Sequence, residues 1–401
     1  MPFSADEAVA LAERIENVIN LPDPIANVGD DNARRRLREA GRKLSLAMEE
    51  PGDTMHRINN TPLQLVLART GVDARIFSIL TSAQGSGLTN EELADKCDVD
   101  PFLMKRLLRY YQSHGMVTQL GNDKFGANNI TKALGSKSGK SGIRYFFDTV
   151  TPAFMALPKF LRLDEFRNPT DRDDLPWHVA HDTKLSPFDW LPKNPNLEYF
   201  LPWMTAHREG LPIFLDVVDF QKEFAQGSTE STPLFVDVGG AGGHQCIALK
   251  QRLPTVPGRV ILQDLPHVID QVKAKLLLGL HGIEIEAYDF FQPQPVRGAR
   301  TYYMRNILHD WPDEKCKEIL ENTKAGMTSD SVLLIDEMVL SERGAPWRAT
   351  QLDMAMMACL GAEERSEAQW RGILESAGFY IKKIWKYTEE CDDCILVAAL
   401  K

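Results

Sequence analysis

The sequence predicts an α/β fold, with a mainly helical N-terminal half and a C-terminal half built on a mostly parallel sheet. The first observation is the stretch 234–243, LFVDVGGAGG, where an apolar run ends in an acid and glycines, and 244–253 continues as a helical pattern. The second is that later apolar runs also end in polar residues, as parallel strands do at a ligand-binding edge. The third is a set of helix-start signals before residue 130.

The glycine stretch has the form of a cofactor-binding loop. Glycine adopts positive φ and lets backbone N–H groups come close to a nucleotide-like ligand. The alternative is that these glycines only allow a helix to pack closely on its strand. A single match does not separate the two interpretations, but the runs that follow favour the cofactor.

Two later strands place acids where such a cofactor would lie. The run 259–262 is followed by Asp264, a carboxylate suited to ribose hydroxyls, although it could simply be a turn residue. The run 283–288 is followed by Asp289 and Phe290, an acid beside aromatic surface suited to an adenine ring. The alternative for this pair is an ordinary strand end with core phenylalanines.

The chemistry-bearing residues come next. Residues 302–312 read YYMRNILHDWP, so His309 lies just after a strand, on the same sheet edge as the glycine loop. The strand 332–335 is followed closely by Glu337, and Glu364 lies in the motif GAEERS. An imidazole with two carboxylates in reach is a standard way to orient a general base and stabilise its protonated form.

Taken together, the motifs VDVGGAGG, LQDLP, YDFF, YYMRNILHDWPDEKC, LLIDEMVL and GAEERS resemble, in order and approximate spacing, the plant-type S-adenosylmethionine (SAM)-dependent O-methyltransferases, a family also common in fungal secondary metabolism. The resemblance covers roughly residue 234 to the C-terminus. It implies a class I methyltransferase domain with a seven-stranded, Rossmann-like sheet, closed by an antiparallel hairpin of 380–385 and 395–400. It also implies a helical, winged-helix dimerisation domain, a homodimer, and SAM as the cofactor.

The resemblance implies a set of cofactor-binding residues at the strand ends: Asp237, Gly239, Gly240, Gly243, Asp264, Asp289, Phe290 and Arg305. The glycines would surround the methionine end of SAM, and Asp264 would hold its ribose. His309 would be the catalytic base, with Glu337 and Glu364 as its flanking acids. The family often has glycine where this chain has Ala241, and one methyl group should narrow that turn without blocking it.

Two segments are candidates for the substrate pocket, because methionine and aromatic side chains suit a flat apolar ring system. They are 200–211 and 353–359. The residues predicted to bind substrate are Trp203, Met204, His207, Met354 and Met357. The alternative for each is core packing between two helices.

The N-terminal half predicts helices over 5–19, capped by Ser4 and Glu7, over 31–48, which is strongly basic, and over 63–80, which is aliphatic and expected to be buried. The predicted division is into a helical, winged-helix dimerisation domain (1–130), a helical connector that contributes to the substrate pocket (131–225), and the SAM-binding catalytic domain (226–401). Within the connector, 167–196 is expected to be an irregular excursion.

Residues 88–117 and a turn at 121–123 give a winged-helix pattern, which also occurs in DNA-binding regulators. Lys105, Arg106 and Arg109 would then face the major groove. A solvated helix face is the alternative, and the net charge of −10 argues against nucleic acid as a partner.

The composition agrees with a soluble enzyme, and with 43% of its 401 residues hydrophobic the chain can bury substantial cores. No apolar run approaches the ~20 residues of a membrane span, and no signal pattern begins the chain, so we expect a cytoplasmic protein without a membrane partner. Cys391 and Cys394 form a C-x-x-C pair, which is too few ligands for a structural zinc site, and no metal is predicted.

The predicted function is metal-independent transfer of a methyl group from SAM to a hydroxyl of a small aromatic or polyketide-type secondary metabolite, with a histidine base. The alternatives are a SAM-binding pericyclase or decarboxylase on this fold and, further away, a winged-helix DNA-binding regulator. A positioned base could also serve transfer to nitrogen or carbon.

Overall fold

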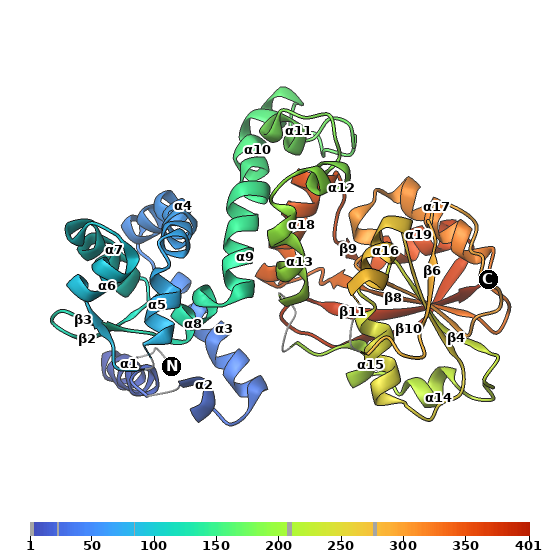
Figure 1. Cartoon of the computed structure of the whole chain (residues 1–401), viewed down its shortest axis with the longest axis horizontal. Coiled ribbons are helices and arrows are strands. Elements are labelled where there is room, and N and C mark those ends of the chain that lie inside the picture. The colour runs from blue at the N-terminus through green and yellow to red at the C-terminus, as the bar shows by residue number, and fades with distance from the viewer. Residues whose placement is uncertain (1–3, 22–23, 84, 207–210, 276–278) are drawn as a thin grey trace. The chain divides into compact units, whose positions relative to one another are not determined.

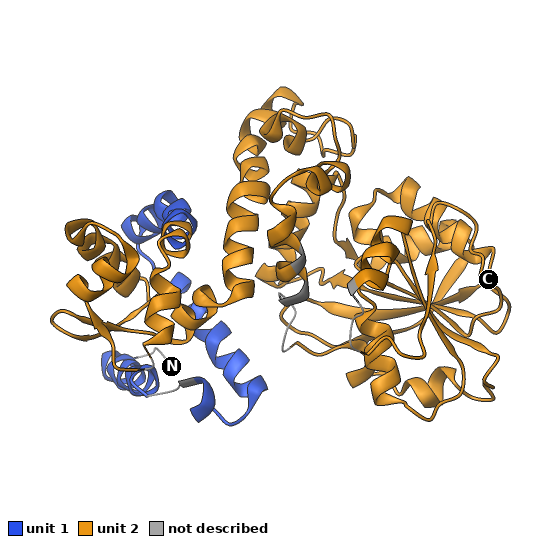
Figure 2. Cartoon of the chain, in the orientation of Figure 1, with its two compact units in different colours: residues 1–68 blue, residues 69–401 orange. Residues whose placement is uncertain are grey.

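The computed structural model describes residues 4–21, 24–83, 85–206, 211–275 and 279–401 of the chain (Figure 1). It divides into two compact units, residues 1–68 and 69–401 (Figure 2). In the part of the chain that the structure describes, no helix combines the length and apolar character of a membrane span.

The first unit is helical. Its helices are α1 (Ala5–Ile19), α2 (Pro24–Asn27), α3 (Asp31–Ala47) and the first part of α4 (Pro51–Asp73). The Ser4 hydroxyl accepts the Glu7 N–H at 3.2 Å and the Glu7 carboxylate accepts the Ser4 N–H at 2.8 Å, which confirms the predicted capping box. Neither α1 nor α3 contains a buried residue.

The prediction of a buried aliphatic helix over 63–80 holds only in part: Ala68 and Val72 are buried, but the stretch is two helices and its start is exposed. Helix α4 ends at Asp73, and α5 (Ile76–Ser82) begins after Arg75, whose φ of 63° lies in the left-handed region and breaks the helix. Ile76 and its neighbours in α5 are buried, whereas Leu63 in α4 is 41% exposed. Aliphatic content alone did not show where the helical geometry stops.

The second unit begins with a small three-stranded sheet of order β1-β3-β2 packed with three helices. Its elements are β1 (Leu88–Thr89), α6 (Asn90–Cys97), α7 (Pro101–Ser113), β2 (Thr118–Gly121) and β3 (Lys124–Gly126), together with α5. The capping box and the hairpin that the winged-helix interpretation needs are both present. Lys105, Arg106 and Arg109 are exposed on α7, while Met104 and Leu108 are fully buried.

A run of helices follows. Its elements are α8 (Asn129–Gly135), α9 (Lys137–Tyr145), the π-helical turn η1 (Phe146–Val150), α10 (Thr151–Leu163), α11 (Pro176–His181), α12 (Pro187–Trp190), η2 (Leu191–Lys193), α13 (Leu197–Ala206), η3 (Phe214–Asp216) and α14 (Phe220–Phe224). Helix α13 packs beside α9, and α10 and α11 pack on α18 (Trp347–Leu360) from the C-terminal part of the chain (Figure 1).

The main sheet has the strand order β10-β11-β8-β7-β4-β5-β6. Its strands are β4 (Pro233–Val238), β5 (Arg259–Asp264), β6 (Glu284–Ala287), β7 (Thr301–Arg305), β8 (Val332–Leu340), β10 (Phe379–Lys386) and β11 (Asp393–Leu400). The strands from β6 to β8 pair in parallel, and β11 pairs antiparallel with both β8 and β10. This confirms the predicted seven-stranded sheet and its hairpin; the two-residue strand β9 (Arg365–Ser366) is an addition beside β8.

Helices cover both faces of this sheet (Figure 1). They are α15 (His244–Arg252), α16 (Pro266–Lys275), α17 (Asp313–Lys324) and α19 (Glu367–Ser376). Along β7, Tyr302 packs into the core that includes α17 and α19, and Tyr303 packs into the opposite core that includes α15 and α16. This alternation is expected of strands buried on both faces. The carboxyl ends of β4, β5 and β7 therefore meet at one edge, where the candidate site lies.

Candidate active site

The glycine loop after β4 requires glycine for steric and conformational reasons. Gly239 has φ of 73°, and its N–H and that of Gly240 donate to the carbonyl of Gln263 at 2.8 and 3.1 Å. A Cβ on Gly240 would lie 2.5 Å from the Asp237 carboxyl group, so no side chain fits there. Ala241 follows with φ of 47°, in the left-handed region where glycine is favoured.

Asp264, at the end of β5, ties the loop to its neighbouring strand. Its Oδ2 accepts the Ala241 N–H at 2.8 Å and its Oδ1 accepts the Leu265 N–H at 2.7 Å. Burial raises the pKa of Asp264. Since a carboxylate has about four acceptor positions, both oxygens keep capacity for ligand hydroxyls.

Asp237 lies beneath the loop. Its side chain is 2% exposed, and its Oδ2 accepts the Cys246 thiol at 3.5 Å. Burial raises the pKa of Asp237 to about 7. Gly243, with φ of 73°, closes the loop by donating its N–H to the Gly240 carbonyl at 2.8 Å, and α15 starts from there.

The residues after β6 form an aromatic edge beside an acid. Asp289 is half-buried, and its Oδ1 accepts the Phe291 N–H at 3.0 Å. The ring of Phe290 meets those of Phe291 and Trp311 edge-on, with centroid separations of 5.1 and 6.0 Å. Phe290 therefore belongs to an aromatic cluster that also includes the HDW motif.

Arg305 ends β7 beside a buried carboxylate. Its Nε lies 3.6 Å from Asp336 Oδ2, and its side chain is 16% exposed. Asp336 also accepts the hydroxyl groups of Tyr303 and Tyr387. The guanidinium is thus held at the sheet edge by an acid that is itself fixed by two phenols.

The strand-end residues fit an adenosyl cofactor. The left-handed loop at Gly239 brings the backbone close to a ligand, Asp264 retains acceptor positions for a ribose, and Asp289 with Phe290 offers an acid beside aromatic surface.

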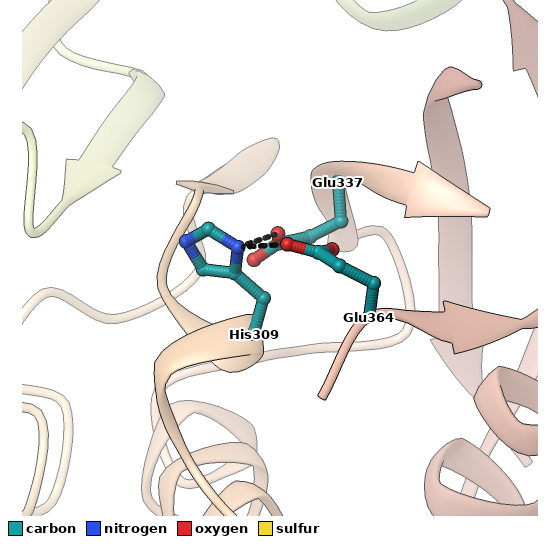
Figure 3. Close-up of side chains that lie close together, drawn as sticks. All are labelled: His309, Glu337 and Glu364. Atoms are coloured by element: carbon teal, nitrogen blue, oxygen red, sulfur yellow. Dashed lines mark hydrogen bonds and ion pairs between the residues drawn. The ribbon is translucent and has the colours of Figure 1, made fainter. Parts of the chain in front are cut away.

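His309, Glu337 and Glu364 converge at the same edge, as Figure 3 shows. His309 lies on η4 (Leu308–Asp310), Glu337 lies in β8, and Glu364 directly precedes β9. His309 Nδ1 is 2.7 Å from Glu364 Oε1 and 4.0 Å from Glu337 Oε2. All three side chains are buried, and their nearest donor and acceptor atoms lie within 4.8 Å of one another. The predicted cluster of one imidazole and two carboxylates is therefore assembled.

The turn that carries His309 is held through its backbone. Glu337 Oε1 accepts the N–H groups of Ile307 and Leu308 at 2.8 and 2.9 Å. On the other side, the fully buried Arg365 donates to the carbonyls of Leu308 and Trp311 at 3.1 and 2.8 Å. Charged hydrogen bonds of this kind fix the turn more firmly than neutral ones would.

The electrostatics of the cluster favour a protonated imidazole. Burial opposes a charge on His309, but the carboxylates of Glu364, Glu337 and Asp310 outweigh it and raise the pKa of His309 to about 10. Burial raises the pKa of Glu337 to about 7 and that of Asp310 to about 6, while the nearby imidazolium acts in the opposite direction. The cluster therefore binds a proton more tightly than a free imidazole does.

The predicted substrate segments lie on two helices. The ring of Trp203 on α13 meets the ring of Phe146 edge-on, with a centroid separation of 5.6 Å. The Trp203 ring also fills the space beside Gly142. Met204 is 41% exposed. His207 lies outside the described residues.

On α18, Met354 is 44% exposed and Met357 is half-buried. Met357 stands one helical turn after Asp353, whose Oδ1 accepts the Glu364 N–H at 2.9 Å. Met357 therefore shares the helix face that approaches the cluster of His309, Glu337 and Glu364.

Two residues of the site, Asp310 and Arg365, were not predicted to have a role, and Asp353 was named only as the start of the predicted substrate segment 353–359. Asp310 and Arg365 stand next to His309 and Glu364 in the quoted motifs, and adjacency was the only available signal. Asp310 Oδ1 lies 3.4 Å from His309 Nε2, so this acid flanks the ring nitrogen that Glu364 leaves free.

Comparison with known proteins identifies the family. A family model described as an O-methyltransferase domain matches residues 217–380. The O-methyltransferase ucdC of Aspergillus ustus is 37% identical over 371 residues, 92% of this chain and 95% of that protein. The structure of the LepI complex with SAM is 36% identical with a TM-score of 0.90, over 99% of this chain and 100% of that one. A structure described as a pericyclic reaction enzyme is 35% identical with a TM-score of 0.89, over the same shares. The chain therefore belongs to the family of S-adenosylmethionine-dependent O-methyltransferases.

Proposed function

We propose that this enzyme methylates a hydroxyl group of a small aromatic or polyketide-type secondary metabolite, with His309 as the general base and without a metal. The observation that carries the proposal is the bond between His309 Nδ1 and Glu364 Oε1 at 2.7 Å. A carboxylate on Nδ1 keeps the proton there, so the lone pair of the neutral ring is at Nε2.

SAM, when bound, supplies the electrophilic methyl group. Nε2 of His309 accepts the proton of the substrate hydroxyl while its oxygen becomes the nucleophile. The resulting imidazolium is stabilised by Glu364 at Nδ1, by Glu337 at 4.0 Å and by Asp310 at 3.4 Å. A phenol has a pKa of about 10, close to that of His309 in this cluster, so the proton moves with little cost in free energy.

The same electrostatics set the expected pH dependence. Because the pKa of His309 is raised to about 10, the imidazolium form dominates at neutral pH. The neutral base becomes more abundant as the pH rises, so kcat/KM should increase through the alkaline range.

The proposal extends to the binding residues and the assembly. The loop of Gly239, Gly240 and Gly243, supported by Asp237 from below, would surround the methionine end of SAM. The other proposed cofactor contacts are Asp264, Asp289, Phe290 and Arg305. Trp203, Met204, His207, Met354 and Met357 would line the substrate pocket. A homodimer, and the division into domains 1–130, 131–225 and 226–401, belong to the same proposal.

The test is turnover of SAM against a panel of phenols and aromatic polyketides, read by mass spectrometry. The wild-type protein should add one methyl group to an acceptor, and His309→Ala should abolish this while retaining S-adenosylhomocysteine binding. His281→Ala, at an exposed position before β6, is the matched control and should keep full activity. Full activity of His309→Ala would remove the base from the mechanism.

A second candidate function has a specific basis, since one similar structure is described as a pericyclic reaction enzyme. A chain of that kind would hold SAM without consuming it. His309, Glu337 and Glu364 all meet in one cluster here, which supports proton abstraction and methyl transfer. Substrate rearrangement or decarboxylation in the panel with no S-adenosylhomocysteine formed would favour the second function.

A further inference from the structure

The segment 167–196 was expected to be irregular throughout, but it contains α11, α12 and η2. It presents one arginine, Arg172, to the turn that carries His309. Arg172 stands on a turn with its own internal hydrogen bonds: the Asp173 N–H donates to Asp171 Oδ1 at 3.0 Å, and the Asp174 N–H donates to the Asp171 carbonyl at 3.1 Å. The position of Arg172 is therefore fixed by the backbone before its side chain makes any contact.

The residues that follow anchor this turn on the catalytic half. Leu175 and Trp177 are each 1% exposed and belong to the hydrophobic cluster with α18. Gly361 at the end of α18 allows the close approach, because a Cβ there would lie 3.0 Å from Leu175. The segment cannot shift without disturbing this packing.

The Arg172 side chain makes two contacts with the turn that carries His309. One terminal N–H donates to the carbonyl of Asp310 at 2.7 Å. The guanidinium carbon lies 4.1 Å from the centroid of the Trp311 ring. The ring of Phe188, from the same segment, is stacked on the Trp311 ring with a centroid separation of 6.3 Å. A planar guanidinium can donate in its plane and stack on an indole at the same time, which an ammonium cannot do.

Arg172 completes the support of the turn. Glu337 holds N–H groups at its start, and Arg365 holds the carbonyls of Leu308 and Trp311. The carbonyl of Asp310, between those two, is held by Arg172 alone among the side-chain hydrogen bonds of the described residues.

The Arg172 cation also acts on the pKa of the Asp310 carboxyl group. Burial raises the pKa of Asp310, and the imidazolium of His309 and the Arg172 cation oppose that rise. The other titratable or charged groups around the turn are Glu337, Glu364, Arg365, Asp313, Cys316 and Tyr145.

We propose that Arg172 is a positioning residue for methyl transfer: through its contacts with Asp310 and Trp311 it fixes the turn that carries His309 and keeps the Asp310 carboxylate ionised beside Nε2. The proposal rests on the proposed function of His309. It assigns a role in the reaction to a segment that lies 138 residues away in the sequence.

The test compares three variants. Arg172→Met keeps the apolar stem without the charge, and Arg172→Lys keeps the charge without the planar fork. Arg167→Met is the matched control, because Arg167 lies in the same segment, is 70% exposed and pairs only locally with Asp164. The first readout needs no acceptor: the [15N]histidine signals of His309 are followed with pH, since Nε2 senses the ionisation of Asp310 at 3.4 Å.

In the wild-type protein and in Arg167→Met, His309 should report an inflection near pH 6 from Asp310. Arg172→Met should move it upward, because the Arg172 cation lowers the pKa of Asp310. Arg172→Lys should leave it in place. With an accepted phenol, both Arg172 variants should lose about tenfold or more in kcat, with KM for SAM within about twofold.

An inflection that stays in place in Arg172→Met, or a full kcat in Arg172→Lys, would overturn the proposal. If the wild-type protein methylates no acceptor, the proposed function fails, and the acceptor-free titration still decides whether Arg172 controls Asp310. A melting temperature for each variant separates misfolding from a local effect.

Discussion

Replacing Glu364 by glutamine removes one charge from the cluster and keeps the shape of the side chain. The Glu364 Oε1 atom is 2.7 Å from His309 Nδ1. A hydrogen bond to a charged group contributes about 1.5–3 kcal/mol, which corresponds to about one to two pH units at about 1.4 kcal/mol per unit. We therefore expect Glu364→Gln to lower the pKa of His309 from about 10 to a value about one to two pH units lower. Glu337 and Asp310 remain and should keep it above that of a free imidazole.

The assay is an NMR titration of [15N]histidine-labelled protein, with His309→Ala used to assign the signal. The matched control is Glu367→Gln, a nearby acid on α19 that is 53% exposed and pairs with Arg371. The pH at which kcat/KM levels off with an accepted phenol should move down with the titration. A His309 titration that is the same in Glu364→Gln and wild type would refute the reasoning, because the charge of Glu364 would then contribute nothing to the pKa of His309.

Three further predictions concern the loop, stability and metal dependence. In a urea titration, Ala241→Gly should raise the free energy of unfolding by no more than about 1 kcal/mol, since it relieves a left-handed φ. The control, Ala248→Gly inside α15, should lower it by about 1 kcal/mol. The pKa of Asp237 is raised from 3.8 to about 7, so its stabilising contribution is present below pH 3.8 and is lost as the pH rises through 7. Asp237→Asn should consequently show a smaller fall in melting temperature over that range, and an equal fall would contradict the assignment. Dialysis against EDTA should leave methyl transfer within about twofold of the untreated enzyme, because a sulfonium electrophile and a histidine base need no Lewis acid; a loss restored by a divalent cation would show a metal requirement.

Much of the site could be predicted because parallel strands bring their carboxyl ends together. Gly239 was identified by a conformational need that appears directly in the sequence. His309 and Glu337 follow neighbouring strands or lie in them, so topology alone placed them at one edge. Glu364 lies outside the parallel strands; it was singled out as a second acid able to reach His309, and the family resemblance pointed to the same residue.

The parts that were missed depend on contacts that leave no pattern. Arg365 and Arg172 donate hydrogen bonds to backbone carbonyls. Every residue has a backbone carbonyl, so the sequence does not mark which ones are bound. The break at Arg75 divides an aliphatic stretch, because the left-handed conformation of this one residue ends the helix. No glycine or proline at that position marks the break in the sequence. Local composition also did not show that Asp264 would bond the Ala241 N–H, since that contact joins two loops.

The antiparallel strand β11 has a consequence for how the protein is made. It is inserted between β8 and β10, yet it is the last strand of the sheet to be synthesised. Until residues 393–400 emerge from the ribosome, β8, which has the sequence VLLIDEMVL and carries Glu337, has an unpaired edge. Unpaired apolar edges recruit other chains. A premature stop before β11 should therefore yield an aggregating polypeptide rather than a weak enzyme, so the acid cluster can form only after β11 has been translated.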